Sequence, residues 1–289
     1  MFNPSVFLQF LFSGLTQGSV YALIALGFMV IYNSSEVINF AQGEFVMLGG
    51  MIAVSCYTAG LPLPLAIIVA VLAATLVGVA FQHVAIRPLK KASSFAMIMV
   101  TIGASIFIRG VAMLIWGKDT FSLPLFVSGA PVMIGGAAII PHYFIVLGAA
   151  VFLMLALHLF FKYTLTGQAM RACASNRKGA ALCGINSERM VKLSFAISAA
   201  LASISGIIIA PTNLTSYDVG IMLGLKGFVV AIIGGLNSFV GTICGGFLLG
   251  LIESFGAGYI SSQYKNAITF SILILILFFR PNGIFGRKR

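Results

Sequence analysis

Long continuous stretches of apolar residues, separated by short polar or basic connections, run along this chain. Such stretches predict transmembrane helices, because about 20 residues of helix span the hydrocarbon core of a bilayer. A membrane β-barrel would instead alternate apolar and polar residues over segments of about ten. The pattern therefore predicts an all-α polytopic integral membrane protein with about eight transmembrane segments. The expected segments are 6–32, 36–58, 62–86, 94–116, 142–161, 192–211, 226–258 and 265–280.

The segment 226–258 is too long for one ordinary span, and a Gly-Gly-Leu-Asn-Ser stretch at 234–238 weakens any helix there. The basic connection 162–192 and the basic tail 280–289 should both be cytoplasmic, because short loops rich in Lys and Arg stay inside. An even number of crossings must then separate them. The long segment is therefore either a re-entrant hairpin, with no crossing, or a helix broken into two crossings. Breaks at membrane depth are tolerated inside protein or along a cavity.

The start of the chain resembles this arrangement weakly. Asn33 opens a polar stretch between two apolar runs, and we expect it at a break comparable to that of Asn237. The two halves of the chain would then form a faint internal repeat, as many transporters do.

Small residues recur four apart in the last third of the chain, as Gly241 with Gly245 and Gly246 with Gly250. Such faces let helix backbones approach closely in lipid. The sequence leaves two interpretations open, packing within this chain or an interface with a second membrane subunit.

Composition agrees with a membrane protein. Of 289 residues, 60% are hydrophobic and 8% are charged, against roughly 25% charged residues in a soluble domain. With only six carboxylates and a mean hydropathy of +1.09, the chain is not a soluble enzyme, a nucleic-acid binder or a disordered protein. The net charge of +11 lies in three clusters between or after the apolar runs, where it sets topology. The clusters are Arg87, Lys90 and Lys91; Lys162, Arg171, Arg177, Lys178, Arg189 and Lys192; and Arg280, Arg287, Lys288 and Arg289.

Polar residues within the apolar segments are the first candidates for function. Intramembrane carboxylates are costly and usually face a cavity or a partner. Glu44 could instead lie at the water interface, in the first turn of a helix whose dipole favours an anion. Arg109 could either snorkel outward or pair with a carboxylate. The candidate translocation-path residues are Asn39, Gln42, Glu44, Asn237 and Glu253.

The long cytoplasmic connection is the second candidate. We expect a short helix at about 167–175 and a second one capped by Asn176 and ended by Gly184. Ser187 is expected to cap the next span, with Glu188 in its first turn. Short helices at the membrane face could dock into a partner's groove. A solvated basic loop that only sets topology is the alternative.

Catalytic chemistry finds no support in the sequence. Two of the four cysteines lie in apolar runs and two in a predicted cytoplasmic loop, so no disulfide is expected. The cysteines have no Cys-x-x-Cys spacing, so a zinc site is not expected. The three histidines are scattered, and no nucleophile–base pair is evident. The chain has no phosphate-binding loop of the type G-x-x-x-x-G-K-[ST], so it should not bind ATP in that way. No metal, no cofactor and no catalytic residue is therefore expected.

Several stretches resemble the permeases of branched-chain amino-acid ABC importers, of the LivH type, and the resemblance covers nearly the whole chain. The most telling is Asn-Phe-Ala-Gln-Gly-Glu at 39–44, although Gln42 stands where relatives often have His. The other matching stretches are 14–23, 164–186, 226–246 and 279–286.

The resemblance implies one permease domain over 1–289, with a cytoplasmic coupling segment at about 163–191 and a basic tail at 280–289. This inner-membrane subunit would pair with a second, LivM-like permease, two cytoplasmic ATPases that bind the ATP, and a periplasmic or lipid-anchored substrate-binding protein. The implied cargo is leucine, isoleucine and valine. The residues implied in ATPase coupling are Gly167, Arg171, Ala172, Asn176, Ala180 and Gly184.

Three alternatives stay open. Urea and short-amide importers use similar permeases. An ion-coupled secondary carrier would work alone, with Glu44 or Glu253 as the titrating group. A membrane-embedded enzyme would need a catalytic constellation that the sequence lacks.

Overall fold

The computed structural model describes residues 4–89, 92–127, 129–280 and 283–285. Most of the basic tail 280–289, and the cations Lys90 and Lys91, lie outside the described residues. Helices make up most of the described chain, and one small hairpin joins two of them. The helices are α1 (Pro4–Ser35), α2 (Gln42–Thr58), α3 (Leu63–Phe81), α4 (Ser94–Trp116), α5 (His142–Tyr163), α6 (Leu165–Ser175), α7 (Arg177–Leu182), α8 (Ser187–Asn213), α9 (Val219–Gly234), α10 (Phe239–Tyr259) and α11 (Lys265–Phe279).

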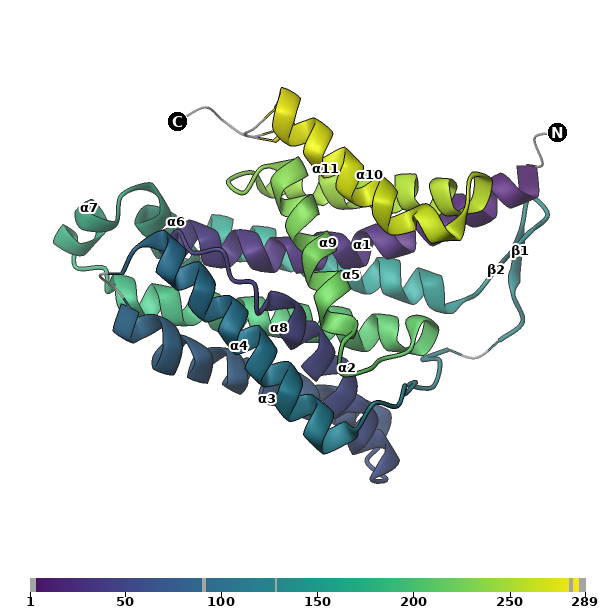
Figure 1. Ribbon diagram of the computed structural model, residues 1–289, viewed down its shortest axis with the longest axis horizontal. Coiled ribbons are helices and arrows are strands. Elements are labelled where there is room, and N and C mark those ends of the chain that lie inside the picture. Colours follow the sequence, from purple (N-terminus) through teal and green to yellow (C-terminus); the bar gives the residue numbers. More distant parts are fainter. Residues whose placement is uncertain (1–3, 90–91, 128, 281–282, 286–289) are drawn as a thin grey trace.

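The protein is a multi-pass membrane protein. Among the described residues, seven helices are long and apolar enough to span a bilayer, namely α1, α3 with its extension to Leu89, α4, α5, α8, α10 and α11. Two shorter helices, α2 and α9, complete the bundle, and α9 crosses the direction of α1 (Figure 1). The expectation of an all-α membrane fold is confirmed, with two short helices within it.

Helix α1 lies at the centre of the bundle. Of its apolar stretch 89% is buried, against 11% for α4 and 6% for α11. Glycines allow the tight contact between α1 and α10: a Cβ on Gly250 would lie 2.4 Å from the backbone of Gly18. Gly246 meets Ala22 of α1 in the same way. Of the two interpretations of the small-residue pattern, packing within the chain is therefore the correct one for these glycines.

The break expected in segment 226–258 is confirmed, because two separate helices, α9 and α10, meet at a turn there. Helix α9 ends at Gly234, and Gly235 has a positive φ of 91° that an L side chain rarely adopts. Ser238 then caps α10 by accepting a hydrogen bond from the Gly241 N–H at 3.1 Å. With 16 residues α9 is about 24 Å long, and it falls below the length of the seven helical stretches that could span a bilayer.

The first break differs from the expectation. The segment expected from residue 36 becomes helical only at Gln42, and Asn33 lies inside α1 rather than at the break. Glu36 has a positive φ of 58°, which ends α1. The Asn39 side chain then accepts a hydrogen bond from the Ala41 N–H at 3.1 Å and starts the turn into α2. Apolar content alone cannot show a left-handed residue, which is why the sequence placed the break at Asn33 and began the next segment at residue 36.

The two ends of the bundle differ in character. Helices α6 and α7 lie at one end, and the N-terminus lies with strands β1 (Val132–Ile134) and β2 (Ala137–Ile139) at the other (Figure 1). The strands form an antiparallel hairpin that the sequence did not predict, and it packs on the start of α1. The N-terminus and the helices α6 and α7 therefore lie at opposite ends of the bundle.

Candidate functional site

The short helices α6 and α7 are built by local capping. The Thr164 hydroxyl accepts a hydrogen bond from the Gly167 N–H at 3.0 Å, and the Asn176 side chain accepts one from Gly179 N–H at 2.9 Å. Gly184 has a φ of 79°, and the following N–H of Ile185 bonds back to Ala180 O at 3.0 Å. The two predicted helices, the Asn176 cap and the Gly184 stop are therefore confirmed.

One predicted cap is wrong. Helix α8 begins at Ser187, so Ser187 is its first helical residue rather than its cap. Asn186 is the cap, and its side chain accepts hydrogen bonds from Glu188 N–H and Arg189 N–H, both at 3.1 Å. An Asn directly before a Ser offers two cap candidates, and sequence alone does not decide between them.

The six residues predicted for ATPase coupling divide into two groups. Arg171, Asn176 and Gly184 are exposed, whereas Gly167 and Ala180 are buried and Ala172 is half-buried. Gly167 leaves no room for a side chain, since a Cβ there would lie 2.2 Å from Phe160 O of α5. The exposed group can meet a partner, and the buried group fixes α6 and α7 against the bundle.

Asn237 lies near this segment rather than near the other path candidates. It lines a cavity of about 960 Å³ at the end of the bundle that carries α6, together with residues of α1, α5 and α6. Asn33 and Arg171 line the same cavity. The two asparagines that the sequence placed at comparable breaks therefore face one space.

Asn39, Gln42 and Glu44 are buried where α2 begins. Gln42 joins three helices: its Oε1 accepts a hydrogen bond from the Ser198 hydroxyl of α8 at 2.7 Å, and that hydroxyl lies 2.9 Å from Gly27 O of α1. The Gln42 amide also donates to Ser198 O at 3.3 Å. These contacts give Gln42 a clear structural role.

Glu44 is 1% exposed, so it lies inside the protein and not at a water interface. Its Oε1 accepts a hydrogen bond from the Ser105 hydroxyl of α4 at 2.7 Å. Its Oε2 has no hydrogen-bond partner among the described residues. Arg109 lies one turn beyond Ser105 on α4 and is half-buried.

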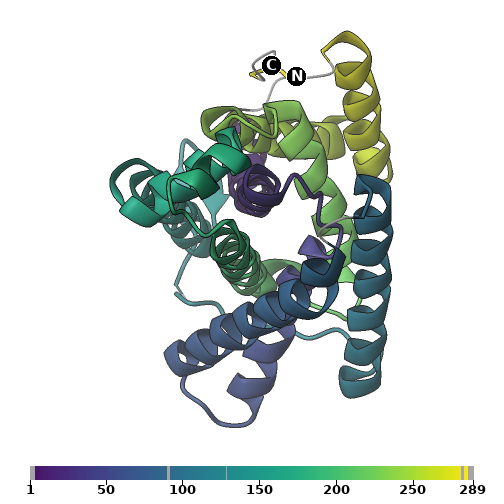
Figure 2. The same cartoon turned by 90° about the vertical axis from the view of Figure 1, so that its left-hand side faces the viewer.

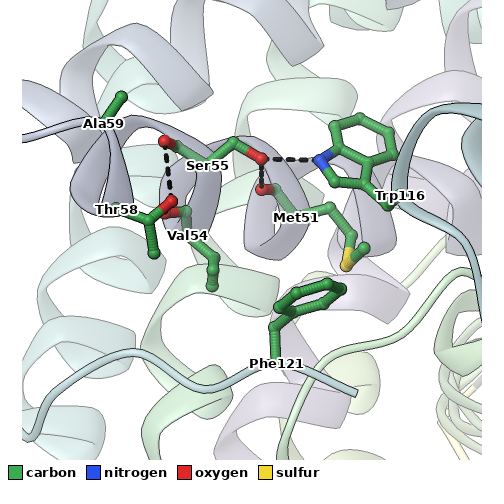
Figure 3. Close-up of a pocket in the computed structure, with 7 residues that line it drawn as sticks. All are labelled: Met51, Val54, Ser55, Thr58, Ala59, Trp116 and Phe121. Atoms are coloured by element: carbon green, nitrogen blue, oxygen red, sulfur yellow. Dashed lines mark hydrogen bonds between the residues drawn. The ribbon is translucent and has the colours of Figure 1, made fainter. Parts of the chain in front are cut away.

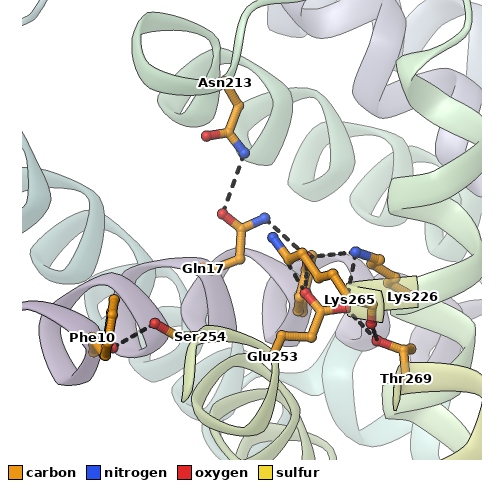
Figure 4. Close-up of polar contacts among 9 residues, drawn as sticks. Phe10, Gln17, Asn213, Lys226, Glu253, Ser254, Lys265 and Thr269 are labelled. Carbon is orange, nitrogen blue, oxygen red and sulfur yellow. Dashed lines mark hydrogen bonds and ion pairs between the residues drawn. The ribbon is translucent and has the colours of Figure 1, made fainter. Parts of the chain in front are cut away.

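Glu253 belongs to a different cluster, which is fully connected (Figure 4). Its Oε1 lies 2.8 Å from Lys226 Nζ of α9, and its Oε2 accepts a hydrogen bond from the Tyr21 hydroxyl of α1 at 2.7 Å. Lys265 Nζ lies 3.5 Å from Oε2, and the Thr269 hydroxyl of α11 also donates to the carboxylate. The buried ion pair thus joins four helices, which is a structural arrangement.

Sequence reasoning did not single out Lys226 as a partner of Glu253. The signal was present, because a lone lysine within an apolar run requires a carboxylate nearby. What the sequence lacks is the identity of that carboxylate.

A small pocket opens at the outer end of α2 and α4 (Figure 3). Its volume is about 340 Å³, and Trp116 donates a hydrogen bond to the Ser55 hydroxyl at 2.6 Å across it. The lining is mainly apolar and consists of Met51, Val54, Ser55, Thr58, Ala59, Trp116 and Phe121. The pocket suits a small molecule with an aliphatic part.

The predicted path residues therefore occupy three places. Asn237 lies at the cytoplasmic cavity, Asn39, Gln42 and Glu44 lie at the start of α2, and Glu253 lies in the ion-pair cluster. Among the described residues, no three His, Cys, Asp or Glu side chains come together as metal ligands.

Comparison with known proteins relates the chain to one family over almost its whole length. The family described as the permease component of the branched-chain amino acid transport system matches residues 10–277. The high-affinity branched-chain amino acid transport system permease LivH of Salmonella typhimurium is 35% identical, and the match covers 97% of this chain and 96% of that one. The corresponding BraD of Pseudomonas aeruginosa is 38% identical over the same shares.

A solved structure agrees in fold. PsaBC from Streptococcus pneumoniae, in complex with Fab, superposes with a TM-score of 0.52 over 96% of this chain and 92% of that one. Sequence identity is 15%, so the likeness concerns the fold alone.

Proposed function

Because the chain belongs to the family of branched-chain amino acid transport system permease components, we propose that it is the membrane-spanning permease subunit of an ATP-driven importer of leucine, isoleucine and valine in the bacterial inner membrane. It works with other components of an ABC transport system and is itself not an enzyme. ATP is bound by the partner subunits, and the permease needs no cofactor of its own.

The observation that carries the coupling role is the pair of short capped helices α6 and α7 at the basic end of the bundle. They project from the ends of α5 and α8, so a push on them acts directly on two long spans. The exposed Arg171, Asn176 and Gly184 form the contact with a cytoplasmic ATPase, and two ATPases serve the complete transporter. Asparagine caps at both α7 and α8 keep this segment ordered before docking.

A second permease subunit, related to LivM, covers the most exposed spans. Helices α4 and α11 lie one below the other along one flank (Figure 2). With only 11% and 6% of their apolar stretches buried, they leave a broad face for a second membrane subunit. A substrate-binding protein delivers the amino acid at the opposite end from α6 and α7, near the outer pocket.

Uptake by the reconstituted transporter tests this function. Proteoliposomes that contain both permeases and both ATPases, with the binding protein outside and ATP inside, should accumulate labelled leucine. Collapse of the proton gradient should leave uptake unchanged, whereas removal of ATP should abolish it. Uptake lost with the gradient while ATP is present would identify an ion-coupled carrier, and preferred uptake of urea would identify the other cargo.

A variant pair tests the coupling segment. Arg171→Glu should strongly reduce ATP-driven uptake in an assembled transporter, because it places a carboxylate in the contact that the guanidinium makes. Lys118→Glu makes the same charge change at an exposed site beyond the outer end of α4, and it should transport normally. Normal uptake by Arg171→Glu would refute the docking assignment.

A further inference from the structure

We propose that Glu44, Ser105 and Arg109 form the site that holds the charged head group of an amino acid inside the membrane. Glu44 receives the ammonium group, and Arg109 receives the carboxylate group. This inference rests on the proposed function, and it adds the ligand chemistry and two residues of α4 that the path candidates did not include.

The first observation is the unused hydrogen-bonding capacity of Glu44. The side chain is 1% exposed, and only Oε1 has a partner, the Ser105 hydroxyl at 2.7 Å. Oε2 is buried without any hydrogen bond among the described residues. An unsatisfied buried carboxylate oxygen is expensive, so its retention points to a donor that binds there. An ammonium group supplies up to three donors and a compensating charge.

The second observation is the contrast with the other buried carboxylate. Glu253 has a lysine 2.8 Å away and hydrogen bonds to both oxygens, so its charge is already compensated. Arg109 lies on α4 one turn beyond Ser105, the hydrogen-bond partner of Glu44, and no ion pair within 4.0 Å joins Arg109 to Glu44 in the described structure. Two opposite charges held on facing helices without direct contact are suited to a ligand that carries both charges.

The third observation is the register of α2 and α4. Three hydrogen bonds join α2, or the residue just before it, to α4, and the two partners are 61 residues apart in every case. The pairs are Phe40 with Thr101, Glu44 with Ser105, and Ser55 with Trp116. The two helices therefore run parallel and in step. Arg109 lies one turn, about 6 Å, outward of the level of Glu44.

The fourth observation is the apolar pocket at the C-terminal ends of α2 and α4. Trp116 lies seven residues beyond Arg109, about 10 Å farther along α4, at the outer pocket of about 340 Å³. The contact between α2 and α4 thus has the apolar pocket near its C-terminal end and Glu44 near its N-terminal end. Arg109 is only partly buried, because α4 lies on the exposed flank. An aliphatic side chain directed outward toward Met51 and Trp116 leaves the head group directed at Glu44.

Direct binding to the permease tests the proposal without the selectivity of the substrate-binding protein. The assay measures binding of labelled leucine to the purified transporter, permeases with ATPases, in the absence of the binding protein. The competitors are leucinamide, which lacks the carboxylate, and 4-methylpentanoate, which lacks the ammonium group. The wild type should prefer leucine to both analogues by about tenfold or more, since each lost charge-assisted contact is worth at least that much.

Each variant should lose the preference over one of the two analogues and keep the preference over the other. Glu44→Gln should lose the preference over 4-methylpentanoate while it keeps the preference over leucinamide, and Arg109→Gln should do the reverse. Arg109→Lys keeps the positive charge and should restore discrimination against leucinamide. Asp218→Asn and Lys118→Gln remove the same charges at exposed outer positions and should behave like the wild type.

The outcomes separate this proposal from the proposed function. Absence of ATP-driven leucine uptake by the wild type would refute the function itself. Normal uptake, together with equal discrimination in the wild type, Glu44→Gln and Arg109→Gln, would refute only the head-group site. Normal uptake without measurable leucine binding to the permease would refute it as well. If Glu44→Gln does not assemble, the Arg109→Gln and Arg109→Lys pair decides the question alone.

Discussion

Replacement of Glu253 by Gln should destabilise the chain strongly. Glu253 is fully buried, and its carboxylate accepts contacts from four side chains on three other helices. Removal of one partner of a buried ion pair leaves an uncompensated charge and typically costs about 3–5 kcal/mol. In Glu253→Gln that charge is Lys226, which is 5% exposed. We therefore expect a loss of about 3–5 kcal/mol in the free energy of unfolding.

Two further variants make this magnitude interpretable. Lys265 is partly exposed and lies 3.5 Å from the carboxylate, so Lys265→Met should cost at most about 1 kcal/mol. The double variant Lys226→Met with Glu253→Gln removes both buried charges, so its cost should be smaller than the sum of the two single variants by about 1–3 kcal/mol.

The assay is SDS-induced unfolding of the purified chain in mild detergent, followed by helical circular dichroism. The chain has a single tryptophan, Trp116 on the distant α4, and its fluorescence gives a second signal. The reasoning would be wrong if Glu253→Gln unfolded within 1 kcal/mol of the wild type, or if the two single costs simply added.

Three shorter predictions concern packing, capping and surface charge. Gly250→Ala should destabilise the chain by about 1–3 kcal/mol, because the added Cβ would clash with the backbone of α1. Gly148 faces open space, so Gly148→Ala should stabilise α5 by about 0.5–1 kcal/mol. SDS-induced unfolding measures both changes. Asn176→Ala removes the cap of α7 at a local cost of about 1 kcal/mol, and faster amide hydrogen exchange in α7 should report it. Glu188→Gln removes an exposed ion pair with Arg87 and should change the unfolding free energy by less than about 1 kcal/mol in the same SDS titration.

The spans and the breaks differ in how far sequence determines them. Continuous apolar runs predicted the helices well, because the bilayer imposes their length. The break at 234–238 followed from glycines and from the parity of charged loops, and the caps at Asn176 and Gly184 followed from local turn chemistry. Each of these signals lies within a few residues of the feature that it predicts.

The side-chain pairings within the candidate sites, in contrast, join residues that are far apart in the sequence. Ser105 and Glu44 are separated by 61 residues, and Tyr21 and Glu253 by 232. No local pattern identifies such partners, since they depend on how the helices pack. The positive φ of Glu36 was missed for a related reason, because hydropathy carries no information on backbone conformation.

The ion pair between α9 and α10 also constrains how the protein is made. A lysine at the centre of a helix costs about 2.5–3.5 kcal/mol on the scale of translocon insertion, and α9 has only 16 residues to offset that cost. Its partner Glu253 lies in the next helix, beyond the turn at Gly235. During synthesis α9 should therefore wait beside the translocon until α10 emerges, and the two should enter the lipid together as a neutral helical hairpin.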